Sequence, residues 1–227
     1  MRAALTVFCD FDGTVTTRDV LGELLATLAD PAWSAIETAW EQGRIGSREC
    51  LAKQIPLIRG GWPAIQRVLG TAAIDPTFAG YTRWCASQGV AVIVVSDGLD
   101  RVIERVLTRD RVRVDGVWAN HLVVGEDGAL SVTFPHPRRD LDCRGGLCKC
   151  RVLAQATTRR VVIGDGLSDL CWASRADVCF AKGRLLASCR AQQVACHEFE
   201  DFTTVQDALA SLLVQDRDLS SASLLTR

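Results

Sequence analysis

The chain has 227 residues, of which 48% are hydrophobic, and its formal net charge is -1. That length suits one sizeable core, or one core with a small appended module. The nearly balanced charge gives no whole-chain field that would gather nucleic acid or an anionic membrane, so we expect neither as a partner.

The apolar runs of the sequence are short. Only a brief apolar stretch separates the first residues from Asp10, and the longest later run, Val90 to Val95, has the length of a strand. Runs of this size do not form a signal peptide or a membrane span. We therefore expect a cytoplasmic protein.

Four apolar, β-branched runs predict buried strands, and each ends in polar or glycine residues. Short continuous runs of this kind are typical of strands that are buried on both faces of a parallel sheet. Helical patterns, such as Asp100 to Leu107 and Lys149 to Ala156, alternate with them. This alternation predicts an α/β fold with a doubly wound, mainly parallel sheet. The four runs are Leu5–Cys9, Val90–Val95, Val161–Ile163 and Val178–Phe180.

Residues 17–75 interrupt the alternation of strands and helices. They contain leucines at helical spacing, and prolines break the pattern at intervals. An insert of this length, directly after the first strand, is too long for an ordinary connection between a strand and a helix. We expect a small helical cap over residues 17–75 and an α/β core made of residues 1–16 and 76–215. The leucines are Leu21, Leu24, Leu25 and Leu28.

Three further segments depart from the core pattern. Residues 112–134 predict a β-hairpin, because Gly125 to Gly128 supplies turn residues between two strand-like runs. Residues 135–150 form a candidate substrate loop. The polar, serine-rich residues 216–227 are expected to be a flexible tail.

The ten cysteines are expected to be free thiols, because several lie in strand-like runs and no secretory signal is recognised. One group allows an alternative. His136 and three nearby cysteines could form a tetrahedral zinc site, although the spacing of the last two is tighter than usual. A loop that shapes the substrate pocket is the favoured interpretation. The three cysteines are Cys143, Cys148 and Cys150.

The strongest polar signals come directly after predicted strands. Asp10 and Asp12 follow the first strand, Ser96–Gly98 follows the second, and Asp165 and Asp169 follow the third. In open α/β sheets, ligands bind outside the carboxyl ends of the strands. We therefore expect the three segments to converge on one crevice.

The residue types in this crevice suit a divalent cation and a phosphate. Asp10, Asp12 and Asp165 would repel one another and raise one another's pKa unless a cation lay between them. Mg²⁺ fits, because it takes few carboxylates and keeps waters and phosphate oxygens as its other ligands. Ser96 would add a hydrogen-bond donor and Lys149 a positive charge. Each residue alone reads as a turn, a helix cap or a surface lysine, but their joint occurrence in this order favours a site.

These motifs resemble the haloacid dehalogenase superfamily of phosphohydrolases over nearly the whole chain. The first motif is Asp10–Thr14, the second is Val95–Gly98, the third is Lys149 and the fourth is Gly164–Asp169. The helical insert and the hairpin are similar to those of the phosphoserine-phosphatase-like branch.

The resemblance implies a magnesium-dependent phosphatase reaction in which Asp10, Asp12 and Lys149 are catalytic. Asp10 would attack phosphorus to form an aspartyl-phosphate, while Asp12 would protonate the leaving group and then activate water. Mg²⁺ would bind Asp10, the backbone carbonyl of Asp12 and Asp165. Asp169 would orient Lys149 or metal-bound waters from behind. The residues expected to hold the phosphate are Ser96, Asp97, Gly98 and Lys149.

The implied partner is a small phosphorylated metabolite. Phe134–His136 and Cys143–Leu153 resemble the methionine-salvage phosphatases that act on 2-hydroxy-3-keto-5-methylthiopentenyl-1-phosphate, and His136 and Asp19 would bind the substrate. The alternatives are a phosphoserine phosphatase and a phosphoethanolamine or phosphocholine phosphatase. The substrate stays open because Asp97 replaces the second motif's usual first glycine and Asp19 replaces a glutamate.

A phosphate-accepting regulatory module is the alternative class of function, because receiver-like domains also carry acidic clusters at strand ends. Asp12, Lys149 and the cap favour turnover instead. The protein is expected to act as a monomer or a homodimer.

Overall fold

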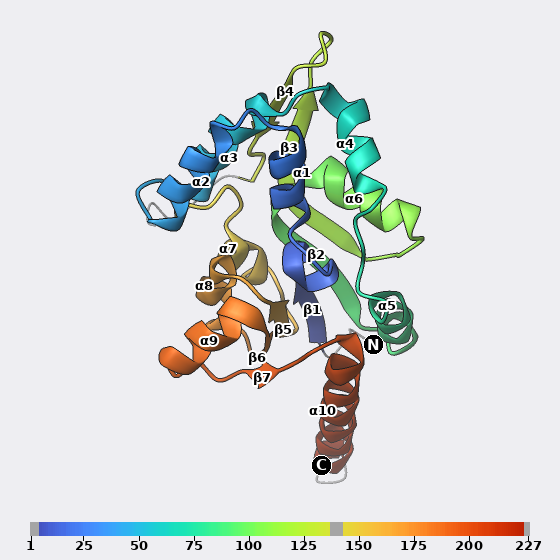
Figure 1. Cartoon of the computed structure of the whole chain (residues 1–227). Helices are drawn as coiled ribbons and strands as arrows, with labels where there is room; N and C mark the ends of the chain where they lie inside the picture. Colours follow the sequence, from blue (N-terminus) through green and yellow to red (C-terminus); the bar gives the residue numbers. More distant parts are fainter. Residues whose placement is uncertain (1–4, 137–142, 225–227) are drawn as a thin grey trace.

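The computed structural model of the protein describes residues 5–136 and 143–224, with side chains up to residue 214 (Figure 1). The strands in this part of the chain form one sheet of seven strands in the order β4-β3-β2-β1-β5-β6-β7. Neighbouring strands are parallel except for β3 and β4, which are antiparallel. The predicted fold class is confirmed. The strands are β1 (Leu5–Cys9), β2 (Ala91–Leu99), β3 (Gly116–Val124), β4 (Leu130–Thr133), β5 (Arg159–Gly164), β6 (Val178–Ala181) and β7 (His197–Glu198).

The path of the chain through the sheet creates a crevice. From β1 the chain moves outward through β2 and β3 to β4, and it then returns to β5, on the other side of β1. The carboxyl ends of β1 and β5 are therefore neighbours at a topological switch point, where ligands bind in folds of this kind. Cys9 and Ile163 are register partners, so Asp10 and Asp165 both lie just beyond this edge.

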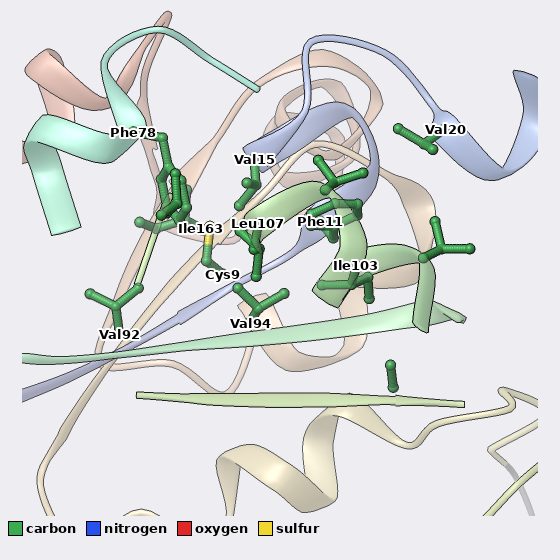
Figure 2. Packing of buried hydrophobic residues seen from close by; sticks show 14 of the residues in the cluster. Cys9, Phe11, Val15, Val20, Phe78, Val92, Val94, Ile103, Leu107 and Ile163 are labelled. Carbon is green, nitrogen blue, oxygen red and sulfur yellow. The ribbon is translucent and has the colours of Figure 1, made fainter. Parts of the chain in front are cut away.

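Six helices of the described chain cover the two faces of the sheet. Val7 and Cys9 of β1 pack in one hydrophobic cluster with residues of α5, α6 and α10. Phe8, which points to the opposite face, packs in a second cluster with residues of α7 and α8. Figure 2 shows the first face, where Phe78 and Leu107 pack around the strands. The helices are α5 (Phe78–Ser87), α6 (Asp100–Arg109), α7 (Lys149–Leu153), α8 (Leu170–Ala173), α9 (Gly183–Ala191) and α10 (Phe202–Leu224).

Residues 17–75 are helical, as the sequence predicts, and contain four α-helices. These helices gather at the end of the molecule opposite α10 (Figure 1). Val20, Leu24 and Ile65 belong to the same hydrophobic cluster as Val7 of β1, so the segment has no separate core of its own. Its role as a cap stays a prediction. The helices are α1 (Val20–Leu28), α2 (Trp33–Glu41), α3 (Ser47–Gln54) and α4 (Gly61–Leu69).

Helix α2 differs from the other helices of this segment because none of its residues is buried. Trp33 and Trp40 are only half-buried. The helix contacts α3, and its apolar side chains therefore pack against few partners.

The hairpin predicted over 112–134 corresponds to β3 and β4, which are joined by the turn at Gly125–Gly128. The first part of β3 also pairs in parallel with β2, since Val94 is the partner of Val117. The hairpin is thus an extension of the main sheet.

Helix α10 extends further than the sequence analysis expected. A flexible tail was predicted from residue 216, whereas the helix continues to Leu224. Its first half is anchored by four buried apolar side chains on one face, and an established helix propagates easily beyond its packed part. None of the helices in residues 5–136 and 143–224 is long and apolar enough to cross a lipid bilayer. The four anchoring residues are Phe202, Val205, Leu209 and Leu213.

Phe202 should be the main anchor of α10. Its ring is fully buried, and its centroid lies 4.6 Å from that of Phe78 and 5.1 Å from that of Tyr81. We expect Phe202→Ala to lower the free energy of unfolding by about 3–5 kcal/mol, because it leaves a cavity in the core. Urea denaturation measures the change. The control Val214→Ala, at a side chain that is 56% exposed, should change it by less than about 0.5 kcal/mol. Equal effects would contradict the assignment.

Candidate active site

A cavity of about 660 Å³ lies between the carboxyl ends of β1, β2 and β5 and the helices α1, α2 and α3. Residues that follow different strands come together here, as the switch-point argument predicts. The helical side contributes Asp19 and several apolar side chains. The members of the predicted site that line the cavity are Asp10, Asp12, Asp19, Ser96, Asp97, Gly98, Lys149 and Asp165.

A buried ion network lies at the base of the cavity. Lys149 Nζ is 2.5 Å from Asp10 Oδ1 and 2.6 Å from Asp169 Oδ1. All three residues are less than 10% exposed. Lys149 is the first residue of α7, while Asp10 follows β1 directly, so the contact joins two segments far apart in the sequence.

Burial raises the pKa of Asp10 well above its ordinary value, and the neighbouring charge of Asp169 adds to this, while Lys149 opposes it. Burial also disfavours the charged form of Lys149, but the carboxylates of Asp10 and Asp169 outweigh it and raise the pKa of the ammonium group. Lys149 is therefore a fixed cation that favours the ionised form of Asp10 and opposes the effect of burial.

Asp169 has a complete set of hydrogen-bond donors. Its Oδ1 accepts from Lys149 Nζ and, at 3.0 Å, from Trp172 Nε1. Its Oδ2 accepts from the amides of Asp165, at 3.3 Å, and Gly166, at 3.1 Å. Asp169 therefore orients Lys149 and the turn after β5.

Asp165 faces Asp10 across the switch point. Its Oδ1 accepts a hydrogen bond of 2.7 Å from the hydroxyl of Thr14, and burial raises its pKa. Asp10, Asp165 and Asp169 each offer an oxygen atom within 4.8 Å of the others. In the described part of the chain, no other group of three or more His, Cys, Asp or Glu side chains meets this criterion.

The donor set fits a hard divalent cation. It consists of carboxylate oxygens, which Mg²⁺ prefers. Carboxylates also outnumber cations in the lining of the cavity, which contains seven Asp and Glu side chains but four Lys and Arg side chains. A bound cation would offset this excess of negative charge.

Gly13 makes the approach of Asp165 possible. Its φ is +74°, and a Cβ atom at this position would lie 2.5 Å from Asp165 Oδ2. Glycine is required here for both reasons, because other residues rarely adopt a positive φ and a side chain would displace the carboxylate.

The side chain of Asp12 contacts the first turn of α1. Its Oδ1 accepts hydrogen bonds from the amides of Val20, at 2.9 Å, and Leu21, at 3.4 Å. Burial, followed by the charge of Asp19, raises the pKa of Asp12 to about 7, although the two amides act in the opposite direction. A carboxyl group with a pKa near neutrality suits acid–base catalysis.

Ser96 is placed to donate a hydrogen bond into the cavity. Its Oγ accepts the amide of Gly98 at 2.9 Å, which keeps the hydroxyl hydrogen for another partner. A Cβ atom on Gly98 would lie 3.0 Å from both Asp12 Oδ2 and Ser96 Oγ. Gly98 therefore keeps the two side chains close to each other.

Asp19 lines the cavity, but it also has a local structural role. It is the N-cap of α1, where its Oδ1 accepts the amide of Gly22 at 2.9 Å. The side chain is exposed, so part of the carboxylate stays accessible to a ligand.

His136 is not brought to this cavity. It lines a different one, and its ring packs against Trp118 with centroids 4.7 Å apart. The expectation that His136 contacts the substrate is not supported, because the aromatic surface of Trp118 draws it to another part of the sheet. Nor does it form a metal-binding group with Cys143, Cys148 and Cys150 in the described chain. All ten cysteines lie in that part, as free thiols.

Sequence reasoning missed four supporting residues. Thr14 and Trp172 hold the carboxylates of Asp165 and Asp169. Ser47 and Asn120 hold Asp97. Thr14 could have been found from its place in the Asp-Phe-Asp-Gly-Thr run and Trp172 from its place shortly after Asp169, whereas Ser47 and Asn120 depend on contacts between distant segments.

Comparisons with known proteins agree on the kind of molecule. A family model described as haloacid dehalogenase-like hydrolase matches residues 7–174. A Brevibacillus brevis protein named 2-hydroxy-3-keto-5-methylthiopentenyl-1-phosphate phosphatase is 28% identical, covering 90% of this chain and 95% of its own. A protein of the same name from an Exiguobacterium species is 30% identical, covering 86% and 93%.

Solved structures show the same fold. A phospho-aspartyl intermediate analogue of phosphoserine phosphatase matches with a TM-score of 0.68 and 18% identity, covering 92% of this chain and 99% of its own. Cytosolic 5'-nucleotidase IIIB bound to cytidine matches with a TM-score of 0.64 and 17% identity, covering 96% and 88%. At these identities the likeness concerns the fold alone.

The close approach of Gly13 and Asp165 can be tested by adding one methyl group. Gly13→Ala should lower the free energy of unfolding by more than Gly89→Ala does. Gly89 has a similar φ of +69° but no atom within 4 Å of a Cβ, so it should lose only the about 1–2 kcal/mol of a left-handed backbone. Gly13→Ala should lose roughly 1–3 kcal/mol more through crowding. Urea denaturation of both variants checks this, and equal losses would show that Asp165 moves aside freely.

Proposed function

Because the chain belongs to the haloacid dehalogenase-like hydrolases and is a phosphatase like its named relatives, we propose that it hydrolyses a small phosphorylated metabolite through an aspartyl-phosphate on Asp10. The observation that carries this proposal is the 2.5 Å contact between Asp10 and Lys149 at the base of the cavity. The contact places a buried ammonium group against the carboxylate and favours its charged form, which is the form that attacks phosphorus.

The first step forms a bond between Asp10 and phosphorus. Lys149 binds Oδ1 of Asp10, which leaves the second oxygen for the attack. The bond from phosphorus to the substrate oxygen breaks, and the leaving oxygen takes a proton from Asp12. Lys149 and the hydroxyl of Ser96 stabilise the negative charge on the phosphoryl oxygens.

The second step releases phosphate. Asp12, now deprotonated, takes a proton from water, and the water oxygen attacks phosphorus of the aspartyl-phosphate. The bond between phosphorus and Asp10 breaks, and both carboxylates return to their starting forms. The pKa of Asp12, about 7, supports both roles because neither protonation state is strongly disfavoured near neutral pH.

Asp10, Asp165 and the backbone carbonyl of Asp12 would hold Mg²⁺. When bound, Mg²⁺ supplies positive charge that offsets the charge of the phosphoryl group and of the aspartates. Asp169 has its oxygens occupied by four donors, which supports a positioning role.

The helical segment 17–75 would act as the cap that excludes water and selects the leaving group. Its side of the cavity carries the apolar residues Leu21, Leu25, Trp40 and Leu51. An apolar wall favours a leaving group with an apolar end, such as a methylthio group. Together with the names of the relatives, this supports 2-hydroxy-3-keto-5-methylthiopentenyl-1-phosphate as the substrate, in methionine salvage.

A substrate that carries a carboxylate is less well matched. Arg18, Lys182 and Arg184 line the cavity, and Arg18 is paired with Glu23 at 2.9 Å. Asp19, Glu37 and Glu41 add negative charge to the same cavity. We therefore rank a phosphorylated amino alcohol second and phosphoserine third.

The covalent step is tested at Asp10. Asp10→Asn keeps the shape of the side chain but removes the nucleophilic charge, so hydrolysis of an aryl phosphate with Mg²⁺ should fall by about 10⁴-fold or more. The same loss is expected when EDTA removes the metal from the wild type. The control Asp207→Asn, at an exposed residue of α10, should keep full activity. Turnover near the wild-type level in Asp10→Asn would end the proposal. Phosphorylation of the wild type without release of phosphate would indicate a phosphate-accepting module.

The substrate ranking is tested at Asp19. Asparagine caps helices as well as aspartate, so Asp19→Asn removes the charge while α1 stays intact. We expect kcat/KM for the methylthiopentenyl phosphate to fall by about tenfold, while hydrolysis of an aryl phosphate changes by less, through the lower pKa of Asp12 alone. Asp30→Asn, in the same segment but away from the cavity, is the control. Equal losses on both substrates would show that Asp19 serves the fold or the core chemistry.

A further inference from the structure

Asp97 is the meeting point of three segments that are distant in the sequence. Its Oδ2 accepts a hydrogen bond from the hydroxyl of Ser47, the first residue of α3. Its Oδ1 accepts from the amide of Leu147 at 2.7 Å and from Asn120 Nδ2 at 3.0 Å. Asn120 Nδ2 also donates to the backbone oxygen of Asp97 at 2.7 Å.

Further hydrogen bonds join residues 43–48 to residues 143–148 beside Asp97, and we call this set of contacts the seam. The guanidinium group of Arg144 donates to the carbonyl oxygens of Gly43, at 2.8 Å, and Arg44, at 3.0 Å. The carbonyl oxygen of Arg144 accepts the amide of Arg48 at 3.3 Å. The amide of Gly146 also donates to Ser47 Oγ at 3.2 Å. The loop 43–48 and the loop 143–148 are thus fastened to each other along their length.

Two glycines in the seam permit this close approach. A Cβ atom on Gly46 would lie 2.3 Å from the carbonyl oxygen of Arg144. A Cβ atom on Gly146 would lie 2.7 Å from Asp97 Oδ1. A side chain at Gly46 would therefore push the two segments apart, and one at Gly146 would displace the carboxylate of Asp97.

The carboxylate of Asp97 is occupied by these donors, which leaves little capacity for a substrate. Leu147 is held on its other side by the hydrophobic cluster that includes Phe8 and Val95. Lys149 begins α7 only two residues later. The position of the loop at Leu147 therefore determines where Lys149 enters the cavity.

We propose that Asp97 is a positioning residue that ties the cap segment, through Ser47, to the loop that delivers Lys149. Closure of the cap and placement of Lys149 then depend on one carboxylate. The inference rests on the proposed phosphatase reaction and replaces the expectation that Asp97 binds the substrate. Hydrogen bonds to a charged acceptor are stronger than neutral ones, which suits a connection at the half-buried edge of the cavity. We call the contacts of Asp97 with Ser47 and Leu147 the latch.

Hydrogen exchange measured by mass spectrometry tests the latch without reference to activity. Ser47→Ala should accelerate exchange in the peptides that cover 43–50 and 143–148, because the amide of Gly146 loses its acceptor. Asp97→Ala should accelerate exchange in the same peptides, by about tenfold or more, because the amide of Leu147 is freed. Ser47→Thr, which keeps the hydroxyl, should restore slow exchange. The control Ser34→Ala, at an exposed serine on α2, should change neither peptide.

Kinetics then separate positioning from substrate contact. The latch predicts that Ser47→Ala raises KM for the metabolite, while Asp97→Ala also lowers kcat for an aryl phosphate, because Lys149 is displaced. In the double variant Ser47→Ala/Asp97→Ala, the fold-change in KM should be less than the product of the fold-changes in the two single variants. A raised KM in Asp97→Ala with unchanged exchange would overturn the proposal and return Asp97 to substrate binding. Failure of the phosphatase reaction itself would appear as no turnover in the wild type, with the exchange results unaffected.

Discussion

The cost of burying several carboxylates at one sheet edge governs the architecture of this protein. Lys149 lies between Asp10 and Asp169 in a place that water hardly reaches. An isolated charge in such a place is strongly destabilising, whereas a network of paired charges that receives hydrogen bonds from further donors is tolerated. Trp172, Thr14 and the amides of the turn after β5 supply those donors. The chemistry is therefore possible only where several elements meet with little freedom to move.

The packing on one face of the sheet restricts the movement of the elements that carry the charged groups. Phe8, Leu147 and Trp172 pack in the same hydrophobic cluster on one face of the sheet. A few positions from them along the chain lie Asp10, directly after β1, Lys149 on α7 and Asp169 before α8. Apolar packing on that face thus fixes the backbone from which the charged groups extend. The reactive edge is rigid because its neighbours are hydrophobic.

The parts of the site that could be predicted from the sequence depend on local patterns. Asp10, Asp12 and Asp165 follow short apolar runs, and the order of strands in doubly wound sheets brings such positions together. The partners of Asp97 could not be predicted, because Ser47, Asn120 and Leu147 come from segments with no shared pattern. The position of His136 depends likewise on a distant contact, since its ring packs against the half-buried Trp118. Helix α10 continues into the segment expected to be a flexible tail, because helix propagation needs no apolar signal in the sequence.

Helix α2 has a consequence for how the enzyme could diverge. It contributes Trp40 and Glu41 to the wall of the cavity, yet none of its residues is buried. Exchanges at exposed or half-exposed positions usually change the free energy of unfolding by little. Natural variants can therefore alter the shape and charge of this wall while the ion network and the sheet stay intact. The wall formed by α2 can therefore change during evolution, while the ion network and the sheet are kept.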